Sequence, residues 1–334
     1  HKLSSLSSIA SIHNMSKFAV PVARIIDAFA STGLKQIAVR SPLQKNFQEL
    51  TYNELSEMTK KIASNLTKEF GYKRGDVLVS DLPNTTENLL LQIACSRLGV
   101  AYASVKNSDG LTTLQTAVEK TGNGILKGCI STSMDSDLSS AQLNHPAIIA
   151  SDEESIDTFC ELTNSNLSSD ALEEVTDNTA STLPWGYFNS TQPLQHADVL
   201  HLAQMCSNHL NMTPEDRVCV SITLCHSFGI ASACAASLLA GATIVLPAVG
   251  GILGCGVPSE RAAATLNMLG SERCTLLFAD SHILKALGGL PPIHATSGGL
   301  SHLRGGVVKV GSGSDFMTDT VKYGDVTLST MSKL

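Results

Sequence analysis

The sequence lacks the short motifs that mark common metal, nucleotide and nucleophile sites. It contains no C-x-x-C pair, no H-E-x-x-H, no Walker A loop and no G-x-S-x-G elbow, and GSGS at 311–314 is typical of a loop. The nine cysteines therefore predict small buried side chains in a reducing compartment, without a disulfide framework or a metal cluster. Aromatic residues make up only 4%, but 43% hydrophobic residues in 334 are enough for one large or two moderate cores.

Positive charge is absent from a long central stretch of the chain. Residues 128–216 contain 14 acidic side chains and neither lysine nor arginine. Side chains of such a stretch cannot contact the phosphates of a nucleic acid, so we expect no nucleic-acid partner. Two interpretations stay open for this block, a solvated acidic surface or a docking site for a basic partner.

Negative charge is absent from the beginning of the chain, where the first acidic residue is Asp27. The start is serine-rich and carries Lys2, Lys17 and Arg24, a composition typical of organellar targeting segments. Residues 1–20 are therefore predicted to be an N-terminal extension, the remainder of a mitochondrial or plastid presequence, and of these we expect a mitochondrial location on the matrix side. A polar tail without a targeting role fits the same residues.

Residues 218–259 contain no charged side chain at all, which raises the question of a membrane span. Gly229, Gly241 and Pro247 interrupt this run and divide it into VCVSITL, HSFGIASACAASLLA and ATIVLP. The pieces are typical of a buried strand, a helix of small residues that ends before Gly241, and a second buried strand. We therefore expect no transmembrane span, and membrane association only through partner proteins.

Helices and strands are expected to alternate along the first part of the chain. Residues 51–70 have helical spacing and begin with a capping box formed by Thr51 and Glu54. This alternation predicts a mostly parallel sheet. Residues 131–184 are rich in Ser, Asp and Asn and predict loops. The expected order is a helix at 51–70, a strand within 74–84, a helix at 87–100, strands at 101–105 and 147–150, and a short helix at 156–162, in a first α/β region at 21–180 that is followed by a second at 181–334.

Four segments, taken in order, resemble the adenylate-forming superfamily of acyl-CoA synthetases, luciferases and nonribosomal adenylation domains. Within DRVCVSITLCHSFGIASACAASLLAGATIVLP, His226 and Gly229 match the family pattern P-L-F-H-x-x-G. This resemblance implies the α/β fold of the family's N-terminal domain, with two stacked αβα subdomains, and lacking the C-terminal lid domain. The other segments are LTYNEL at 50–55, RGDVLVSDLPN with LGVAYASV at 74–105, and LSHLRGGVVKVGSGSDFM at 300–317.

The resemblance also implies a reaction, in which a carboxylate attacks the α-phosphate of ATP and a thiol such as coenzyme A then takes the acyl group. The family's phosphate loop, Y-T-S-G-T-T-G-x-P-K, corresponds here to a degenerate loop at Asn189, Ser190 and Thr191 and to the residues that follow it. Both glycines are absent, and Pro193 fixes φ and removes an N–H donor. His196 replaces the lysine and carries positive charge only when it is protonated.

The family's metal-binding acid is replaced as well. By its distance from the LRGG strand, the motif Y-G-x-T-E corresponds to STMSK at 329–333, so Lys333 stands where a carboxylate would bind Mg²⁺. YGD at 323–325 is a second match for the same motif. The sequence ends at Leu334, before the family's ribose-binding aspartate and catalytic lysine. We therefore expect no catalytic residue, no cofactor and no metal, with His226 and Gly229 left as a vestigial pocket or kept for packing.

These expectations lead to one main hypothesis and two alternatives. The main hypothesis is a catalytically inactive relative of acyl-CoA synthetases that serves as a structural subunit of a larger mitochondrial complex. By analogy alone, this complex is the peripheral stalk of an ATP synthase. One alternative is an adenylate-forming acyl-CoA ligase whose C-terminal domain is missing. The other is a sensor module that binds an acyl group or a nucleotide.

Overall fold

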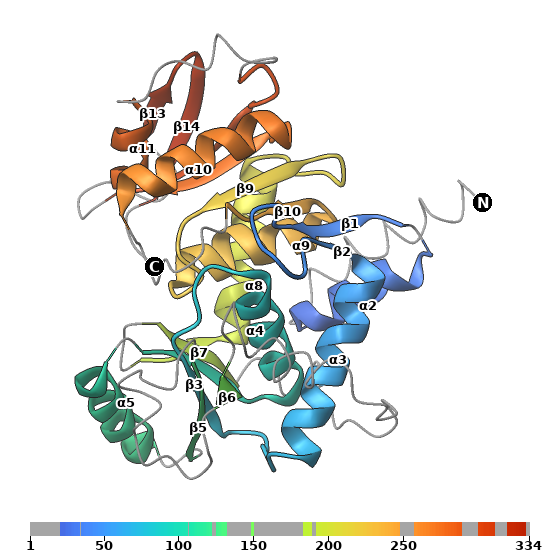
Figure 1. The fold of residues 1–334 in the computed structure, drawn as a ribbon, viewed down its shortest axis with the longest axis vertical. Coiled ribbons are helices and arrows are strands. Elements are labelled where there is room, and N and C mark those ends of the chain that lie inside the picture. The colour runs from blue at the N-terminus through green and yellow to red at the C-terminus, as the bar shows by residue number, and fades with distance from the viewer. Residues whose placement is uncertain are drawn as a thin grey trace. The chain divides into compact units, whose positions relative to one another are not determined.

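The structure is a computed structural model, and its described residues form two compact units (Figure 1). Unit 1 comprises 1–35, 51–83 and 87–201, and unit 2 comprises 36–50, 84–86 and 202–334. The predicted regions, with limits at residues 20 and 180, are consecutive in the sequence, whereas each of these compact units combines several separate stretches. The predicted limits therefore remain predictions. The structure describes residues 21–33, 35–105, 107–121, 125–131, 148–149, 183–188, 192–247, 257–288, 300–310 and 319–331.

Unit 1 is built on a six-stranded sheet with the order β6-β5-β3-β4-β7-β8. All neighbouring strands are parallel except β7 and β8, which are antiparallel. The sheet confirms the predicted strands at 74–84, 101–105 and 147–150, whereas the helix predicted at 156–162 lies outside the described residues. The strands are β3 (Val77–Ser80), β4 (Ala101–Ser104), β5 (Leu126–Ser131), β6 (Ile148–Ile149), β7 (Pro184–Phe188) and β8 (Leu194–Gln195).

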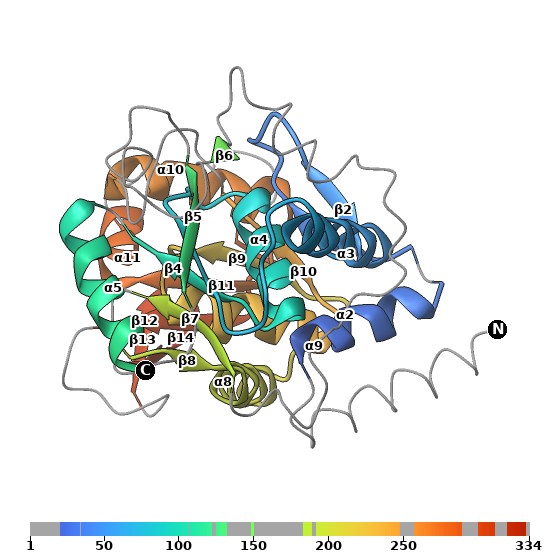
Figure 2. The same cartoon turned by 90° about the horizontal axis from the view of Figure 1, so that it is seen from below.

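Helices cover both faces of the unit 1 sheet, as Figure 2 shows with α5 on one side of the strands and α4 and α3 on the other. The predicted capping box begins α3, because the Thr51 side chain accepts from the Glu54 N–H and the Glu54 carboxylate accepts from the Thr51 N–H. Apolar side chains of β3, β4 and α5 form one core cluster that includes Val79 and Leu114. The helices of unit 1 are α2 (Val22–Ser31), α3 (Tyr52–Lys68), α4 (Thr86–Leu98) and α5 (Ser108–Thr121), and α8 (His196–His209) leads from unit 1 into unit 2.

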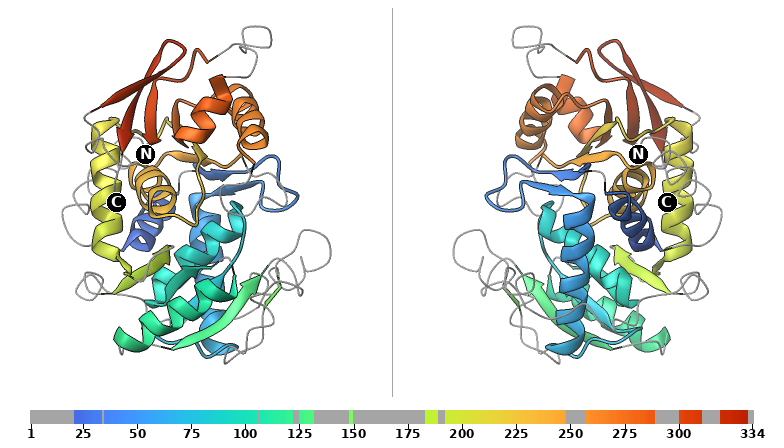
Figure 3. Two further views of the ribbon diagram at one scale, coloured as in Figure 1. Left: turned by 90° about the vertical axis from the view of Figure 1, so that its left-hand side faces the viewer. Right: turned by 90° about the vertical axis from the view of Figure 1, so that its right-hand side faces the viewer.

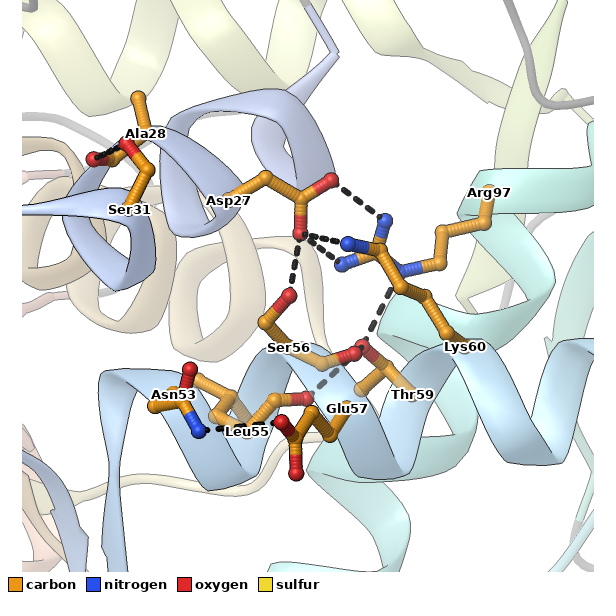
Figure 4. Close-up of polar contacts among 10 residues, drawn as sticks. All are labelled: Asp27, Ala28, Ser31, Asn53, Leu55, Ser56, Glu57, Thr59, Lys60 and Arg97. Atoms are coloured by element: carbon orange, nitrogen blue, oxygen red, sulfur yellow. Dashed lines mark hydrogen bonds and ion pairs between the residues drawn. The ribbon is translucent and has the colours of Figure 1, made fainter. Parts of the chain in front are cut away.

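An ion pair between the buried Arg97 and the half-buried Asp27 lies where three helices of unit 1 meet (Figure 4). Arg97 of α4, whose side chain is fully buried, donates to both carboxylate oxygens of Asp27 on α2, at 2.7 and 3.0 Å. Ser56 and Lys60 of α3 contact the same carboxylate. Burial alone would raise the pKa of Asp27, but the hydrogen bonds and charge of Arg97 hold it below its ordinary value. The pair therefore stabilises unit 1 only while Asp27 is ionised.

Unit 2 is built on an eight-stranded sheet with the order β13-β14-β12-β11-β9-β10-β1-β2. Its neighbouring strands β14, β12, β11, β9, β10 and β1 run parallel, so their carboxyl ends meet at one edge. The strands are β1 (Ile37–Arg40), β2 (Glu49–Thr51), β9 (Arg217–Ser221), β10 (Thr243–Val245), β11 (Leu276–Asp280), β12 (Gly305–Lys309), β13 (Thr320–Tyr323) and β14 (Val326–Met331).

The order in which strands are added to this sheet reverses after β10, because β10 lies on one side of β9 and β11 on the other. This reversal places helices on both faces of the sheet. Figure 3 shows α10 (Pro258–Ser271) and α11 (Ser281–Gly288) on one face, with η1 (Phe228–Ala235) and α9 (Ala236–Ala240) on the other. This is the arrangement that right-handed crossovers give when strand order changes direction. Among the described residues, no helix has the length and apolar character that crossing a membrane requires.

The predicted helix of small residues between β9 and β10 is present, but its first part is a π-helix. Residues Phe228–Ala235 are all buried and form η1, which continues directly as α9. Gly241 ends α9 with φ of 72°, as expected for a glycine after a helix. The sequence could not reveal the wider turn, because a segment buried on every side has no apolar stripe from which a period can be measured.

Candidate functional site

Polar side chains gather at the carboxyl edge of the unit 2 sheet. Strands β11 and β12 end at Asp280 and Lys309, which are register partners, and His226 lies in the loop that follows β9. In sheets of this kind, ligands bind at the carboxyl ends of the strands where the strand order reverses. We therefore take this edge of the unit 2 sheet as the candidate site.

The loop before His226 is held in shape by backbone contacts. The Asn84 side chain accepts from the Leu224 N–H at 2.8 Å. Gly229, at the start of η1, packs so closely that a Cβ atom there would lie 2.2 Å from the Thr223 carbonyl oxygen. Only glycine fits at this position. Gly229, predicted as part of a vestigial pocket, therefore shapes the loop that presents His226.

His226 contacts Lys309, which comes from a strand 83 residues further along the chain. The Lys309 Nζ contacts the Nε2 of His226 and lies 3.3 Å from its Nδ1. The Nδ1 also faces the Phe228 N–H at 3.3 Å. Burial, together with the charge of Lys309, lowers the pKa of His226 to about 4. At neutral pH the pair therefore consists of a neutral imidazole beside an ammonium group.

Lys309 was not identified from the sequence. It is the last residue of LRGGVVK, the strand segment that carried part of the family resemblance. A polar residue at the carboxyl end of a buried parallel strand is a sequence feature that could have indicated it. Its contact with His226 could not be predicted, because the two residues meet only through the pairing of β9, β11 and β12.

The segment predicted to correspond to the phosphate loop lies in unit 1, between β7 and α8. Asn189, Ser190 and Thr191 lie outside the described residues, whereas Pro193 and His196 are described. His196 is the first residue of α8 and is only 4% exposed. Its side chain therefore points into the protein.

The buried ring of His196 packs against a second aromatic ring. Its ring packs against Trp185 at 5.2 Å between centroids. Among the described residues, neither of its ring nitrogens nor the Trp185 Nε1 has a hydrogen-bond partner. Burial lowers the pKa of His196 to about 4. At neutral pH His196 is thus uncharged and does not replace the positive charge of a lysine.

The first turn of α8 also has its own anionic cap. The Asp198 carboxylate accepts from the Gln195 N–H at 3.0 Å, and negative charge is favourable at that end of a helix. Any phosphate near this end would have to bind in the presence of that carboxylate. Among the described residues 192–198, which follow the predicted phosphate loop, no side chain is positively charged at neutral pH.

The described residues do not fit a divalent metal ion. They contain no group of three or more His, Cys, Asp or Glu side chains arranged to hold one. Lys333, predicted to replace the metal-binding acid, lies outside the described residues, whereas the rival match contains Tyr323 of β13 and the turn that follows it. We therefore derive no chemical step through a metal ion.

Comparison with known proteins links the chain to adenylate-forming enzymes. Residues 27–182 match the family described as AMP-binding enzyme. No curated protein matches. ATP-bound MatB from Rhodopseudomonas palustris is 17% identical with a TM-score of 0.68, over 87% of this chain and 55% of that chain. A long-chain-fatty-acid-CoA ligase from Archaeoglobus fulgidus is 16% identical with a TM-score of 0.65, over 88% of this chain and 58% of that chain. VinN in complex with 3-methylaspartate is 16% identical with a TM-score of 0.63, over 89% of this chain and 72% of that chain.

These likenesses show the fold of the N-terminal domain of adenylate-forming enzymes, which confirms the predicted fold class. This chain spans little more than half the length of the ligase from Archaeoglobus and of MatB. The predicted mitochondrial location, the partner subunits and the link to an ATP synthase have no support in the structure or in the comparisons.

The prediction that the protein is catalytically inactive is contradicted by the comparisons. The matched family is one of enzymes, and the solved structures of this fold include a long-chain-fatty-acid-CoA ligase. The prediction depended on the glycines and the lysine that the phosphate loop lacks. Every residue except proline still offers a backbone N–H, and Ser190 and Thr191 add hydroxyl groups, so the loss of the glycines and the lysine does not by itself exclude phosphate binding.

Proposed function

We propose that this protein is an ATP-dependent ligase that activates a carboxylic acid as its acyl-adenylate. The observation that carries the proposal is the match of residues 27–182 to AMP-binding enzymes in a chain with the two-sheet fold of ligase N-terminal domains. Support also comes from relatives, since the solved MatB structure is ATP-bound and VinN was solved with 3-methylaspartate.

The proposed step forms one bond and breaks another. A carboxylate oxygen of the acid bonds to the α-phosphorus of ATP, while the bond from that phosphorus to the bridging oxygen breaks and pyrophosphate leaves. The N–H and hydroxyl groups of the 189–192 segment would hold the departing phosphates. Since His196 is neutral and Pro193 offers no N–H, we expect these contacts to be few and the KM for ATP to be high.

His226 and Lys309 are assigned to the side of the acid. They lie at the carboxyl edge of the parallel strands of unit 2, where ligands of such sheets bind. The uncharged imidazole can exchange hydrogen bonds with a ligand without adding charge, and the ammonium supplies one positive charge. The pair thus orients a carboxylic acid rather than transferring a proton at neutral pH.

The test is exchange of radiolabelled pyrophosphate into ATP in the presence of single carboxylic acids. The panel should contain fatty acids, amino acids and dicarboxylic acids, with magnesium supplied in solution. We expect acid-dependent exchange for at least one member. A test variant is the double substitution Ser190→Ala with Thr191→Ala, which removes two hydroxyls from the predicted phosphate loop. It should lower exchange by about 10-fold or more. A folded wild-type protein with no exchange above background for every acid would contradict the proposal.

A further inference from the structure

Four buried polar atoms of unit 1 have no hydrogen-bond partner among the described residues. They are both ring nitrogens of His196, the Nε1 of Trp185 and the Oε1 of Gln195. His196 and Trp185 are only 4% and 1% exposed, so their nitrogens do not exchange hydrogen bonds with bulk solvent. A buried donor or acceptor without a partner costs the free energy of its lost hydration, and native proteins rarely leave such groups unpaired. Their occurrence in one small region therefore indicates a binding site.

These side chains come from two paired strands and the helix that follows them. Trp185 lies in β7, at the point where the pairing with β8 has an irregular register. Gln195 is the last residue of β8 and His196 the first of α8, and the His196 N–H donates to the Leu183 carbonyl at 3.1 Å. The ring centroids of Trp185 and His196 are 5.2 Å apart. The backbone therefore holds the indole and the imidazole next to one another.

The unpaired atoms include both donors and acceptors. Burial lowers the pKa of His196 to about 4, so at neutral pH its ring has one donating and one accepting nitrogen. The Trp185 Nε1–H can only donate, and the Gln195 Oε1 can only accept. An anion would face the lone pairs of the Gln195 oxygen, and a metal cation would face the Trp185 N–H. Water both donates and accepts, and a buried water typically makes about three hydrogen bonds to groups that are otherwise unpaired.

We propose that Trp185, Gln195 and His196 form a site for buried water, in which one molecule accepts from the Trp185 N–H and donates to a ring nitrogen of His196. The Gln195 Oε1 is an acceptor for the second hydrogen of this water. The two nitrogens of an imidazole point away from each other, so one water cannot reach both, and the His196 N–H requires a second water. This inference is independent of the proposed ligase function.

The bridging water would also connect the two ends of the predicted phosphate loop. Strand β7 ends at Phe188 and α8 begins at His196, so the segment between them starts and finishes beside this site. A hydrogen-bonded bridge from Trp185 to His196 holds these two ends together without adding charge. It also gives a reason for polar groups at positions where purely apolar side chains would leave no unpaired atom.

The single tryptophan of the chain makes the site observable by NMR. In ¹⁵N-labelled protein, the indole N–H signal of Trp185 should show a cross-peak with water, of the sign expected for a long-lived bound molecule. His196→Leu removes the accepting nitrogen from the bridge, so this cross-peak should be lost. The matched control is His201→Leu, at an exposed position on the same helix, which should keep it. A high-resolution crystal structure of the wild type should show an isolated oxygen within about 3.2 Å of the Trp185 Nε1.

Three results would overturn the inference. The first is the absence of the water cross-peak in folded wild-type protein, and the second is its persistence in folded His196→Leu. The third is a crystal structure in which a protein group, or a molecule larger than water, accepts from the Trp185 Nε1–H. If His196→Leu does not fold, the wild-type spectrum and the crystal structure still decide. None of these measurements requires ATP or a carboxylic acid, so their outcome is separate from that of the ligase assay.

Discussion

Two histidines of this protein have the same lowered pKa, about 4, but lie in opposite chemical surroundings. In unit 1, His196 packs against Trp185, and its ring nitrogens have no hydrogen-bond partner in the part of the chain that the structure describes. In unit 2, His226 is half-buried at the carboxyl edge of a sheet and contacts Lys309. Burial alone lowers the pKa of the first, whereas burial and a neighbouring positive charge lower that of the second.

The difference teaches how to interpret a histidine in this chain. His196 replaces a lysine in the sequence pattern, yet its position makes it a packing residue. His226 matches the family pattern, and a role in packing alone was also open for it. In the structure, however, its ring contacts the Phe228 N–H and the Lys309 ammonium. Unit 1 does pair its buried charges elsewhere, at Asp27 and Arg97. The unpaired nitrogens of His196 are therefore a local property of that position.

The largest effect should come from breaking the paired region of unit 1. Arg97→Met leaves the Asp27 carboxylate largely buried without its main partner. We expect the free energy of unfolding to fall by about 3 kcal/mol. Denaturation in urea measures this loss. Adding Asp27→Leu should restore a large part of it, because the isolated charge is then removed. A single variant within about 1 kcal/mol of the wild type would contradict this account of the pair.

Gly229→Ala tests whether backbone packing shapes the loop that presents His226. The added Cβ would lie 2.2 Å from the Thr223 carbonyl oxygen, so the loop or η1 must move. We expect a loss of about 2–3 kcal/mol. Gly270→Ala on α10 is the matched control, since a Cβ there meets nothing within 4 Å. It should be neutral or stabilising by about 0.5–1 kcal/mol. Equal effects of the two variants would refute the proposed role of Gly229.

His196→Leu sharpens the comparison through its dependence on pH. The unfolded state binds a proton at His196 near pH 6.5, whereas the folded state does so only near pH 4. Wild-type stability should therefore fall as pH decreases through this window, with a contribution from His196 of about 2–3 kcal/mol. Because leucine does not titrate, the stability of the His196→Leu variant should lack this part of the dependence on pH. His201→Leu, at an exposed position on the same helix, is the control and should keep the wild-type dependence. Parallel curves for all three proteins would contradict the burial of His196.

The smallest effect concerns the predicted phosphate loop. Pro193→Gly adds one N–H donor and frees φ, so it should lower the KM for ATP by about 2- to 10-fold. Pro214→Gly in unit 2 controls for a general loosening of the chain. An unchanged KM in Pro193→Gly would mean that this segment does not contact the phosphates of ATP.

Much of the fold could be predicted from local patterns, and little of the site could. The capping box of Thr51 and Glu54 and the glycine after α9 are local features, and the structure confirms both. The π-helix was hidden in a segment that is buried on every side. The contact of Lys309 with His226 depends on strand order, and the burial of His196 involves packing against Trp185 of the preceding strand β7. Neither leaves a trace in the spacing of neighbouring residues.

The account is tested most directly by looking for the acyl-adenylate itself. Wild-type protein should be incubated with ATP, magnesium and each carboxylic acid of the panel in turn, and the products analysed by mass spectrometry. We expect the acyl-adenylate of at least one acid in wild-type reactions, and about 10-fold less of it in the double variant Ser190→Ala with Thr191→Ala. A folded protein that forms no adenylate from any acid of the panel would contradict the central claim that this chain activates carboxylic acids.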